Sequence, residues 1–445
     1  MVKFFTKASG RINDLILSEI REKCGQLQPG EIVIKPNWVI HQMDDRYPIQ
    51  VLVTDPRVIE ATVLACAEIF PSCTQITVAD CPLQSADWPL LCKQSGFSES
   101  IVRLSERFGS RVRFLDLRRD VFKVGKNFEF IPDTEVPHGD PEGYREIHLQ
   151  ADSHLEEISD QADRFSIVDH DASFARQYHR PGDHRYLVAQ TYLNADLLIN
   201  LPKWKTHSKT GITAALKNLV GINGDKAYLP HFRRGAPRWG GDEYEDADRW
   251  MAWLVSAVKM RVWRRSAWGY KLLRPGGKFL QSLYRQFKRL VKRSGAQPSL
   301  YVGGGGWYGN QTIWRMIYDL NRVMQCVDRE GVLHQEQQRS YFCIVDGLIA
   351  GEGEGPLQPK PRALDCLAFG TDPFELDTAL SWFMGFNPES MPIVSKRLEY
   401  KGPDWGQFDW NDLEVIVDGA HMRLPEAERN YHFMPPSGWR GHIER

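Results

Sequence analysis

The sequence lacks a long hydrophobic run. Its longest fully apolar or small stretch, Trp250 to Val258, is far shorter than the about 20 residues that a membrane-spanning helix needs. The first residues, MVKFFTKASGRINDL, show neither the apolar core nor the small-residue cleavage site of a signal peptide. We therefore expect a cytoplasmic protein, with attachment to a membrane surface as the alternative.

Cysteine pairs of the C-x-x-C type are also absent. The eight cysteines are scattered, and two of them, Cys343 and Cys366, lie inside apolar runs like small hydrophobic residues. This pattern encodes neither a zinc ribbon nor a ferredoxin-type iron–sulfur cluster. It favours a reducing compartment over a disulfide-stabilised extracellular fold.

Net charge is almost absent, but the charges are unevenly distributed. The 56 Lys and Arg residues against 57 Asp and Glu give a formal charge of −1, and 42% of the residues are hydrophobic. Residues 250–318 contain 13 basic and no acidic residues, so the rest of the chain carries a net charge of −14. This composition excludes a disordered chain and a collagen, and the length predicts two or three structural units or one enlarged domain.

The basic segment is also rich in aromatic residues. Hydrophobic residues recur at helical spacing in 279–293, and between them lie Arg285, Lys288, Arg289, Lys292 and Arg293. This pattern is typical of an amphipathic helix that lies on an anionic membrane surface, here through residues 250–293. The alternative is a helical hairpin that packs on the domain with its charged face in water. Nucleic-acid binding is the least favoured interpretation, because no recognisable fold motif accompanies the charge.

Short apolar runs alternate with helical patterns along the remaining chain. The predicted strands are 31–34, 75–79, 112–117, 196–200, 341–345, 364–369 and 413–417, and the predicted helices are 56–70, 210–220 and 374–383. This alternation predicts an α/β fold with a mainly parallel sheet and helices on both faces. We expect the α/β core to comprise 1–225 and 319–445, separated by a basic, aromatic-rich helical insertion at 226–318.

Residues 131–186 interrupt this alternation. They contain 13 acidic and five basic residues, and six of the 13 histidines. The histidine spacing matches neither H-x-x-x-H nor H-E-x-x-H, so we expect a solvated, loop-rich excursion from the core rather than a metal site.

The strongest candidate site is the segment 200–221, NLPKWKTHSKTGITAALKNLVG. It places several cationic residues between a buried strand and a helix, namely Lys203, Lys205, His207, Lys209 and Lys217. Ligands of α/β sheets bind beyond the carboxyl ends of the strands, and the N–H groups at a helix start favour anions. The segment therefore predicts a site for phosphate or carboxylate, although it is not a Walker A loop.

Roles can be assigned to these residues and to others that follow strands. A crowded, desolvated lysine can lose its proton near neutral pH, so Lys205, His207 and Lys217 are the candidate acid–base residues. The residues that we expect to bind the substrate are Lys35, Asn37, Lys203, Thr206, Asn218, Asn310 and Arg315.

A glycine-rich stretch at 346–356 contains three carboxylates, Asp346, Glu352 and Glu354. We expect it to form a turn after a strand. Oxygen ligands of this kind suit a hard divalent cation, so a metal site is one interpretation. The other is that these carboxylates form ion pairs with the lysines.

Several of these segments resemble the prokaryotic "domain of unknown function 362" family. The matching motifs are IKPN at 34–37, TDP at 54–56, the whole of 200–221, VDGLIAGEGEGP at 345–356 and GTDPFELDTAL at 370–380. Many members of that family carry an iron–sulfur ferredoxin module. This chain has no cysteine pattern for one, so no iron–sulfur cluster is expected.

The leading hypothesis is an enzyme that acts on an anionic small molecule, free or lipid-linked. Its chemistry would be Lys/His acid–base catalysis, such as isomerisation, racemisation or elimination, or a metal-assisted group transfer. One alternative is a redox or electron-transfer protein related to the iron–sulfur members of the family. The other is a non-catalytic binding or assembly protein at a membrane surface.

Overall fold

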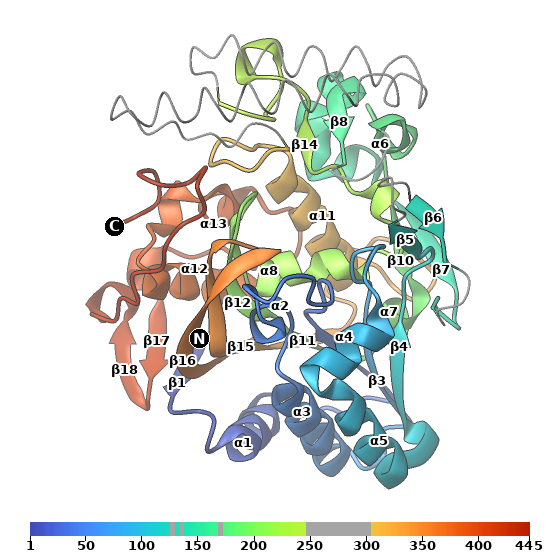
Figure 1. The fold of residues 1–445 in the computed structure, drawn as a ribbon, viewed down its shortest axis with the longest axis vertical. Coiled ribbons are helices and arrows are strands. Elements are labelled where there is room, and N and C mark those ends of the chain that lie inside the picture. Colours follow the sequence, from blue (N-terminus) through green and yellow to red (C-terminus); the bar gives the residue numbers. More distant parts are fainter. Residues whose placement is uncertain (125–129, 134–137, 168–171, 246–303) are drawn as a thin grey trace.

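The computed structural model describes residues 1–124, 130–133, 138–167, 172–245 and 304–445 (Figure 1). The predicted membrane-surface segment 250–293 lies outside these residues. The predicted boundaries of the basic insertion at 226–318 therefore stay a prediction.

An eleven-stranded mixed sheet forms the centre of the molecule. Its main path runs β18 (Ala420–Arg423), β17 (Glu414–Val417), β1 (Val2–Thr6), β16 (Gln358–Gly370), β15 (Ser340–Glu354), β11 (Leu197–Leu201), β2 (Glu31–Pro36), β3 (Gln75–Asp80) and β4 (Val112–Asp116). From β15 to β4 all neighbours are parallel, whereas β16 is antiparallel to both β15 and β1. The expected α/β fold with a mostly parallel sheet is confirmed.

Helices cover both faces of this sheet, because its strands are apolar on both sides. Ile32 and Ile34 of β2 pack in one hydrophobic core, and Val33 between them packs in the other. The first core includes α1 (Ile12–Cys24), α3 (Pro56–Ile69), α4 (Trp88–Ser95) and α5 (Phe97–Phe108). The second includes α7 (Gln190–Asn194), α8 (Ala215–Asn218), α11 (Ile313–Cys326), α12 (Pro373–Met384) and α13 (Pro392–Ser395). Figure 1 shows α1, α3 and α5 grouped together below the sheet.

The acidic segment 131–186 is more ordered than its composition predicts. It contributes β7 (Tyr144–His148) and most of β10 (Asp183–Ala189) to a small separate sheet with β9 (His179–Arg180). His154, His179 and His184 are fully or almost fully buried rather than solvated. The expected loop-rich, solvated excursion is therefore wrong for these residues, because internal partners such as Asp319 for His154 compensate their burial.

Two further predictions about local structure are wrong around the candidate site. In place of a helix over 210–220, Lys203–His207 (β12) and Gly211–Thr213 (β13) form a hairpin, and α8 begins only at Ala215. Gly211 has a φ of +80°, which suits a tight turn and interrupts a helix. The expected turn at 346–356 is instead mostly the extended end of β15, because this strand pairs with β16 on one side and with β12 on the other.

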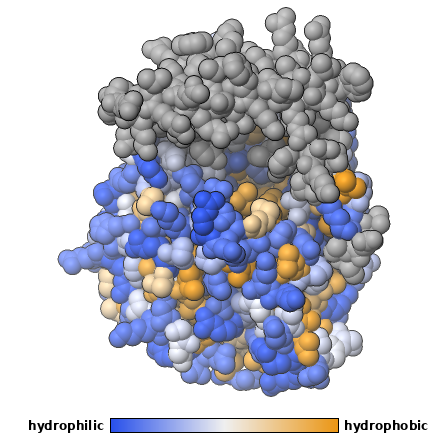
Figure 2. Space-filling view, in the orientation of Figure 1, coloured by the Kyte–Doolittle hydropathy of each residue, from blue (hydrophilic) through white to orange (hydrophobic). Residues whose placement is uncertain are grey.

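The remaining described strands and α-helices are short. They are α2 (Ile49–Leu52), β5 (Phe122–Val124), β6 (Phe130–Pro132), β8 (Phe165–Ser166), α6 (Ala172–Tyr178) and β14 (Phe232–Arg233). Among the described helices, none is long and apolar enough to cross a bilayer. Figure 2 shows hydrophilic side chains over much of the described face, with hydrophobic ones scattered among them.

Candidate active site

A cavity of about 660 Å³ lies beyond the carboxyl ends of β2, β3 and β12. These strands bring Lys35 and Asn37, Asp80, and His207 to its wall. The segment that follows β13 adds Lys217, Lys226 and His231. This is the position at which α/β sheets bind ligands, and the wall carries more cationic than acidic side chains.

An internal ion pair holds one of these cations. The ammonium group of Lys35 lies 2.7 Å from Oδ1 of Asp80, and both side chains are buried. The same carboxylate accepts hydrogen bonds from the backbone N–H groups of Trp38 and Cys81. Asp80 therefore compensates Lys35 and joins the ends of β2 and β3.

Two other lysines in the wall are only partly compensated. Burial, followed by the positive charges of Lys226, Lys209 and Lys35, lowers the pKa of Lys217 to about 7. The pKa of Lys226 is also lowered, chiefly by burial, and its ammonium donates to the carbonyl oxygen of Cys81 at 2.7 Å. An anion in the cavity would stabilise the charged forms of both side chains.

The two cavity histidines are held in opposite tautomers. Nδ1 of His207 accepts a hydrogen bond of 3.1 Å from the backbone N–H of Lys209, so the neutral ring carries its proton on Nε2. Nδ1 of His231 lies 2.7 Å from the carbonyl oxygen of Leu229 and must donate, so its Nε2 keeps a lone pair. Burial and then the nearby lysine charges lower the pKa of both rings well below the usual value. One neutral ring therefore offers a proton and the other a base.

A chain of buried amides connects the cavity with the sheet. Asn37 donates to Oδ1 of Asn218 at 2.9 Å, and Asn218 donates to Oδ1 of Asn200 at 2.7 Å. Asn200 in turn donates to the carbonyl oxygen of Ala215 and to the hydroxyl of Tyr341. The chain fixes the orientation of Asn37 at the wall.

The observed start of α8 lies at Ala215, not at the expected Thr210, and it has a partner within the protein. The carboxylate of Asp377 on α12 accepts the N–H groups of Ala215 and Leu216 at 2.7 and 3.1 Å. Burial raises the pKa of Asp377 to about 7. These two N–H groups therefore hold α8, and with it Lys217, against α12.

The other predicted residues of β12 lie outside the cavity lining. Lys203 forms a buried ion pair of 2.8 Å with Asp346, and the ammonium group of Lys205 donates to the carbonyl oxygen of Leu52. Thr206 donates to the carbonyl oxygen of Gly353. Burial lowers the pKa of Lys205 well below its ordinary value. The cavity wall does include His207, Lys217, Lys35, Asn37 and Asn218. It therefore brings together only part of the predicted catalytic and substrate-binding residues.

Asn310 and Arg315 lie elsewhere, at the start of α11. Oδ1 of Asn310 accepts the N–H groups of Thr312 and Ile313, and Nδ2 donates to the carbonyl oxygens of His231 and Gly305. Arg315 forms an ion pair with Glu157 and lies over the ring of Trp314. Neither residue lines the cavity.

The three candidate metal ligands are spread along one extended strand. Asp346 binds Lys203, and Glu352 pairs with Arg362 at 3.0 Å and accepts the N–H of Met434 at 2.9 Å. Glu354 accepts the N–H of Ser437 and lines the cavity. At about 3.3 Å per residue, Asp346 and Glu352 lie too far apart to share an ion. Within the described ranges, no group of three or more His, Cys, Asp or Glu side chains could hold a metal.

Three functional candidates were missed in the sequence, although signals for two of them exist. Asp80 directly follows a predicted strand, the position at which ligand-binding residues are expected. Lys226 lies in the turn sequence NGDK after 200–221. His231 follows no motif, and only the fold brings it to the wall.

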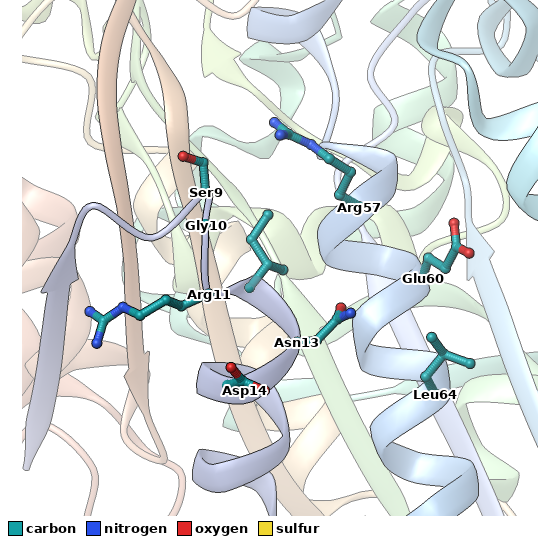
Figure 3. A pocket seen from close by; sticks show the side chains of 9 residues that line it. Ser9, Gly10, Arg11, Asn13, Asp14, Arg57, Glu60 and Leu64 are labelled. Carbon is teal, nitrogen blue, oxygen red and sulfur yellow. The ribbon is translucent and has the colours of Figure 1, made fainter.

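A second pocket, of about 390 Å³, lies between the start of α1 and α3 (Figure 3). Two of its charged side chains form ion pairs, Arg57 with Asp55 and Glu60 with Arg103. It shares no residue with the larger cavity and is a weaker candidate site.

Comparison with known proteins gives a family but no activity. No protein of curated function matches the chain. A crystal structure of a protein from Thermotoga maritima is similar with a TM-score of 0.33 and 11% identity, over 80% of this chain and 54% of that one. The chain thus spans about half the length of that protein. A family model matches residues 136–381, more than half of the sequence, and the chain therefore belongs to the family described as "Domain of unknown function (DUF362)".

Proposed function

We propose that the larger cavity is the active site of an enzyme that transfers protons on a small organic anion. The observation that carries this proposal is the pair of neutral histidines in opposite tautomers, His207 and His231, in one cationic cavity. A proton donor and a proton acceptor in the same site are what general acid–base catalysis requires.

The lysines complete the site. Lys217, with a pKa of about 7, and Lys226 would hold the carboxylate or phosphate of the substrate, and the charge would draw both toward their protonated forms. Nε2 of His231 would take a proton from a carbon beside a carbonyl or carboxylate group, and Nε2–H of His207 would protonate the oxygen on which charge develops. Transfer of the abstracted proton to a neighbouring carbon, with a proton returned from oxygen to His207, gives an isomerisation. Protonation of the same carbon on its opposite face gives a racemisation, and loss of a neighbouring leaving group gives an elimination.

Hydrogen–deuterium exchange into small molecules tests the proposal without knowledge of the substrate. The full chain is incubated in D₂O with a metabolite extract, and the anionic fraction is analysed by mass spectrometry. We expect at least one organic anion to gain a single mass unit. The gain should fall by about 100-fold or more in His207→Gln and in His231→Gln, the usual scale for loss of a general acid or base.

His421→Gln is the matched control, because His421 lies exposed on β18 at the sheet edge. Exchange at the wild-type rate in both cavity variants would show that the histidines do not catalyse it. Absence of any enzyme-dependent exchange in the extract would likewise contradict the proposal.

A further inference from the structure

Three residues that line the cavity each have a buried side-chain oxygen without a hydrogen-bond partner among the described residues. These oxygens are Oδ1 of Asn37, Oγ1 of Thr213 and Oε2 of Glu354. Asn37 is 8% exposed and Thr213 is 3% exposed. Buried polar atoms are normally satisfied, so three unpartnered oxygens around one cavity point to groups that a ligand supplies.

The acceptor role of Asn37 follows from its neighbours. Nδ2 of Asn218 faces three acceptors, Oδ1 of Asn200 and the carbonyl oxygens of Lys35 and Pro36, so the amide of Asn218 cannot be reversed. Its Oδ1 must then accept from Nδ2 of Asn37. This leaves Oδ1 of Asn37 as the atom without a donor.

Glu354 offers a second acceptor. Its Oε1 accepts from both the backbone N–H and the hydroxyl group of Ser437, whereas Oε2 has no partner. An ionised carboxylate only accepts hydrogen bonds. The hydroxyl of Thr213 on β13 can also accept, so all three oxygens can be satisfied by donors from one ligand.

The lysines and the unpartnered oxygens would bind different groups of one ligand. Lys217 and Lys226 attract a negative charge, but a purely anionic or alkyl ligand would leave the three oxygens without donors, and unmade buried hydrogen bonds are costly. We infer that the ligand of this cavity is a polyhydroxylated organic anion, a phosphate or carboxylate whose carbon chain carries hydroxyl groups. This inference rests on the proposed function and specifies its substrate class.

Matched pairs of probes test the inference by calorimetric titration of the full chain. D-Gluconate is compared with hexanoate, and D-glucose 6-phosphate with n-hexyl phosphate, so that the charged group is kept and the hydroxyl groups are removed. We expect the hydroxylated member of at least one pair to bind at least about tenfold more tightly, since each satisfied hydrogen bond contributes a factor of a few. Alkyl anions that bind as tightly as the hydroxylated ones would overturn the inference.

Two variants connect the preference with particular atoms. Thr213→Val removes one unpartnered oxygen at nearly constant shape, and Asn37→Leu removes another. Each should lower the hydroxyl preference about threefold or more, while circular dichroism reports whether the variant is folded. Thr378→Val is the matched control, because Thr378 has a buried hydroxyl without a partner that does not line the cavity.

The outcomes separate the inference from the proposed function. If Thr213→Val leaves the preference for hydroxylated anions unchanged, the unpartnered oxygens do not bind the ligand, even if deuterium exchange still depends on His207. If none of the four anions binds and no enzyme-dependent exchange occurs, both the inference and the proposed function are contradicted.

Discussion

Lys217 illustrates what a single partly buried charge contributes to this protein. Burial lowers its pKa to about 7, so between pH 7 and about 10.5 the folded protein binds fewer protons at this position than the unfolded chain. The contribution of Lys217 to the free energy of unfolding therefore rises with pH across this window, and the full cost of its charge is present below pH 7. Such a cost is consistent with the proposed role of Lys217 in ligand binding.

Replacement of this lysine should therefore stabilise the protein. We expect Lys217→Met to raise the free energy of unfolding at pH 6 by about 2 kcal/mol, and we expect this difference from the wild type to shrink as the pH rises from 7 to 10. Urea denaturation at several pH values measures both effects, and Lys360→Met, at an exposed position on β16, is the control. A variant that is less stable than the wild type at pH 6 would show that Lys217 is not penalised in the fold.

At the scale of elements, the site depends on close contact between segments that are distant in sequence. The 3₁₀ helix Leu219–Ile222 follows α8 and lies against the ends of β2 and β3. A Cβ atom at Gly221 would lie 2.2 Å from Oδ1 of Asp80 and 2.6 Å from Nζ of Lys35. Glycine is thus required here by the buried ion pair rather than by backbone conformation.

Gly221→Ala should consequently damage both the fold and the cavity. The methyl group must displace either Asp80 or Lys35, and separation of a buried ion pair is expected to cost about 3 kcal/mol in the free energy of unfolding. Thermal denaturation and titration with D-glucose 6-phosphate measure the change. Gly10→Ala is the control, because a Cβ atom there would meet nothing within 4 Å. Wild-type stability and affinity in Gly221→Ala would contradict this account.

Also at the scale of elements, the local sequence pattern predicted the strands correctly. It was misleading for the two segments of the site at 210–220 and 346–354. The apolar runs became β2, β3, β11 and β15 because burial on both faces of a parallel sheet leaves a continuous hydrophobic signal. Residues 210–220 have helical composition, but pairing of Lys205 with Thr213 makes a hairpin of their first part. Residues 346–354 look like a turn because of their glycines, yet two neighbouring strands keep them extended.

At the scale of the whole molecule, charge is divided between the acidic remainder and the basic segment. The segment 250–318 contains 13 basic and no acidic residues and therefore carries a net charge of +13. Basic and aromatic residues at helical spacing within 250–293 favour the proposal that these residues meet an anionic membrane surface. The cavity and this segment would then act independently, one on the substrate and the other on location.

This proposal predicts a selective loss of membrane binding. Replacement of Lys288, Arg289, Lys292 and Arg293 by Gln should weaken sedimentation with phosphatidylserine-containing vesicles by at least about tenfold, because each basic residue near such a surface contributes about 1 kcal/mol. Deuterium exchange in the cavity should stay at the wild-type rate. Replacement of Arg46, Arg103 and Arg107, three exposed arginines outside the segment, is the control. Equal sedimentation of both variants with the wild type would exclude an electrostatic role for the segment.

The sequence by itself determined the alternation of strands and helices, the family, and the segments whose ends carry the site, because each of these is written in local patterns of apolar and polar residues. Tertiary structure decided which side chains meet. Lys203, Lys205 and His207 share one strand, yet only His207 reaches the cavity, because Asp346, 143 positions away from Lys203, and Leu52 bind the other two. Likewise, the proton positions on His207 and His231 depend on backbone groups that only the folded chain brings within hydrogen-bond distance.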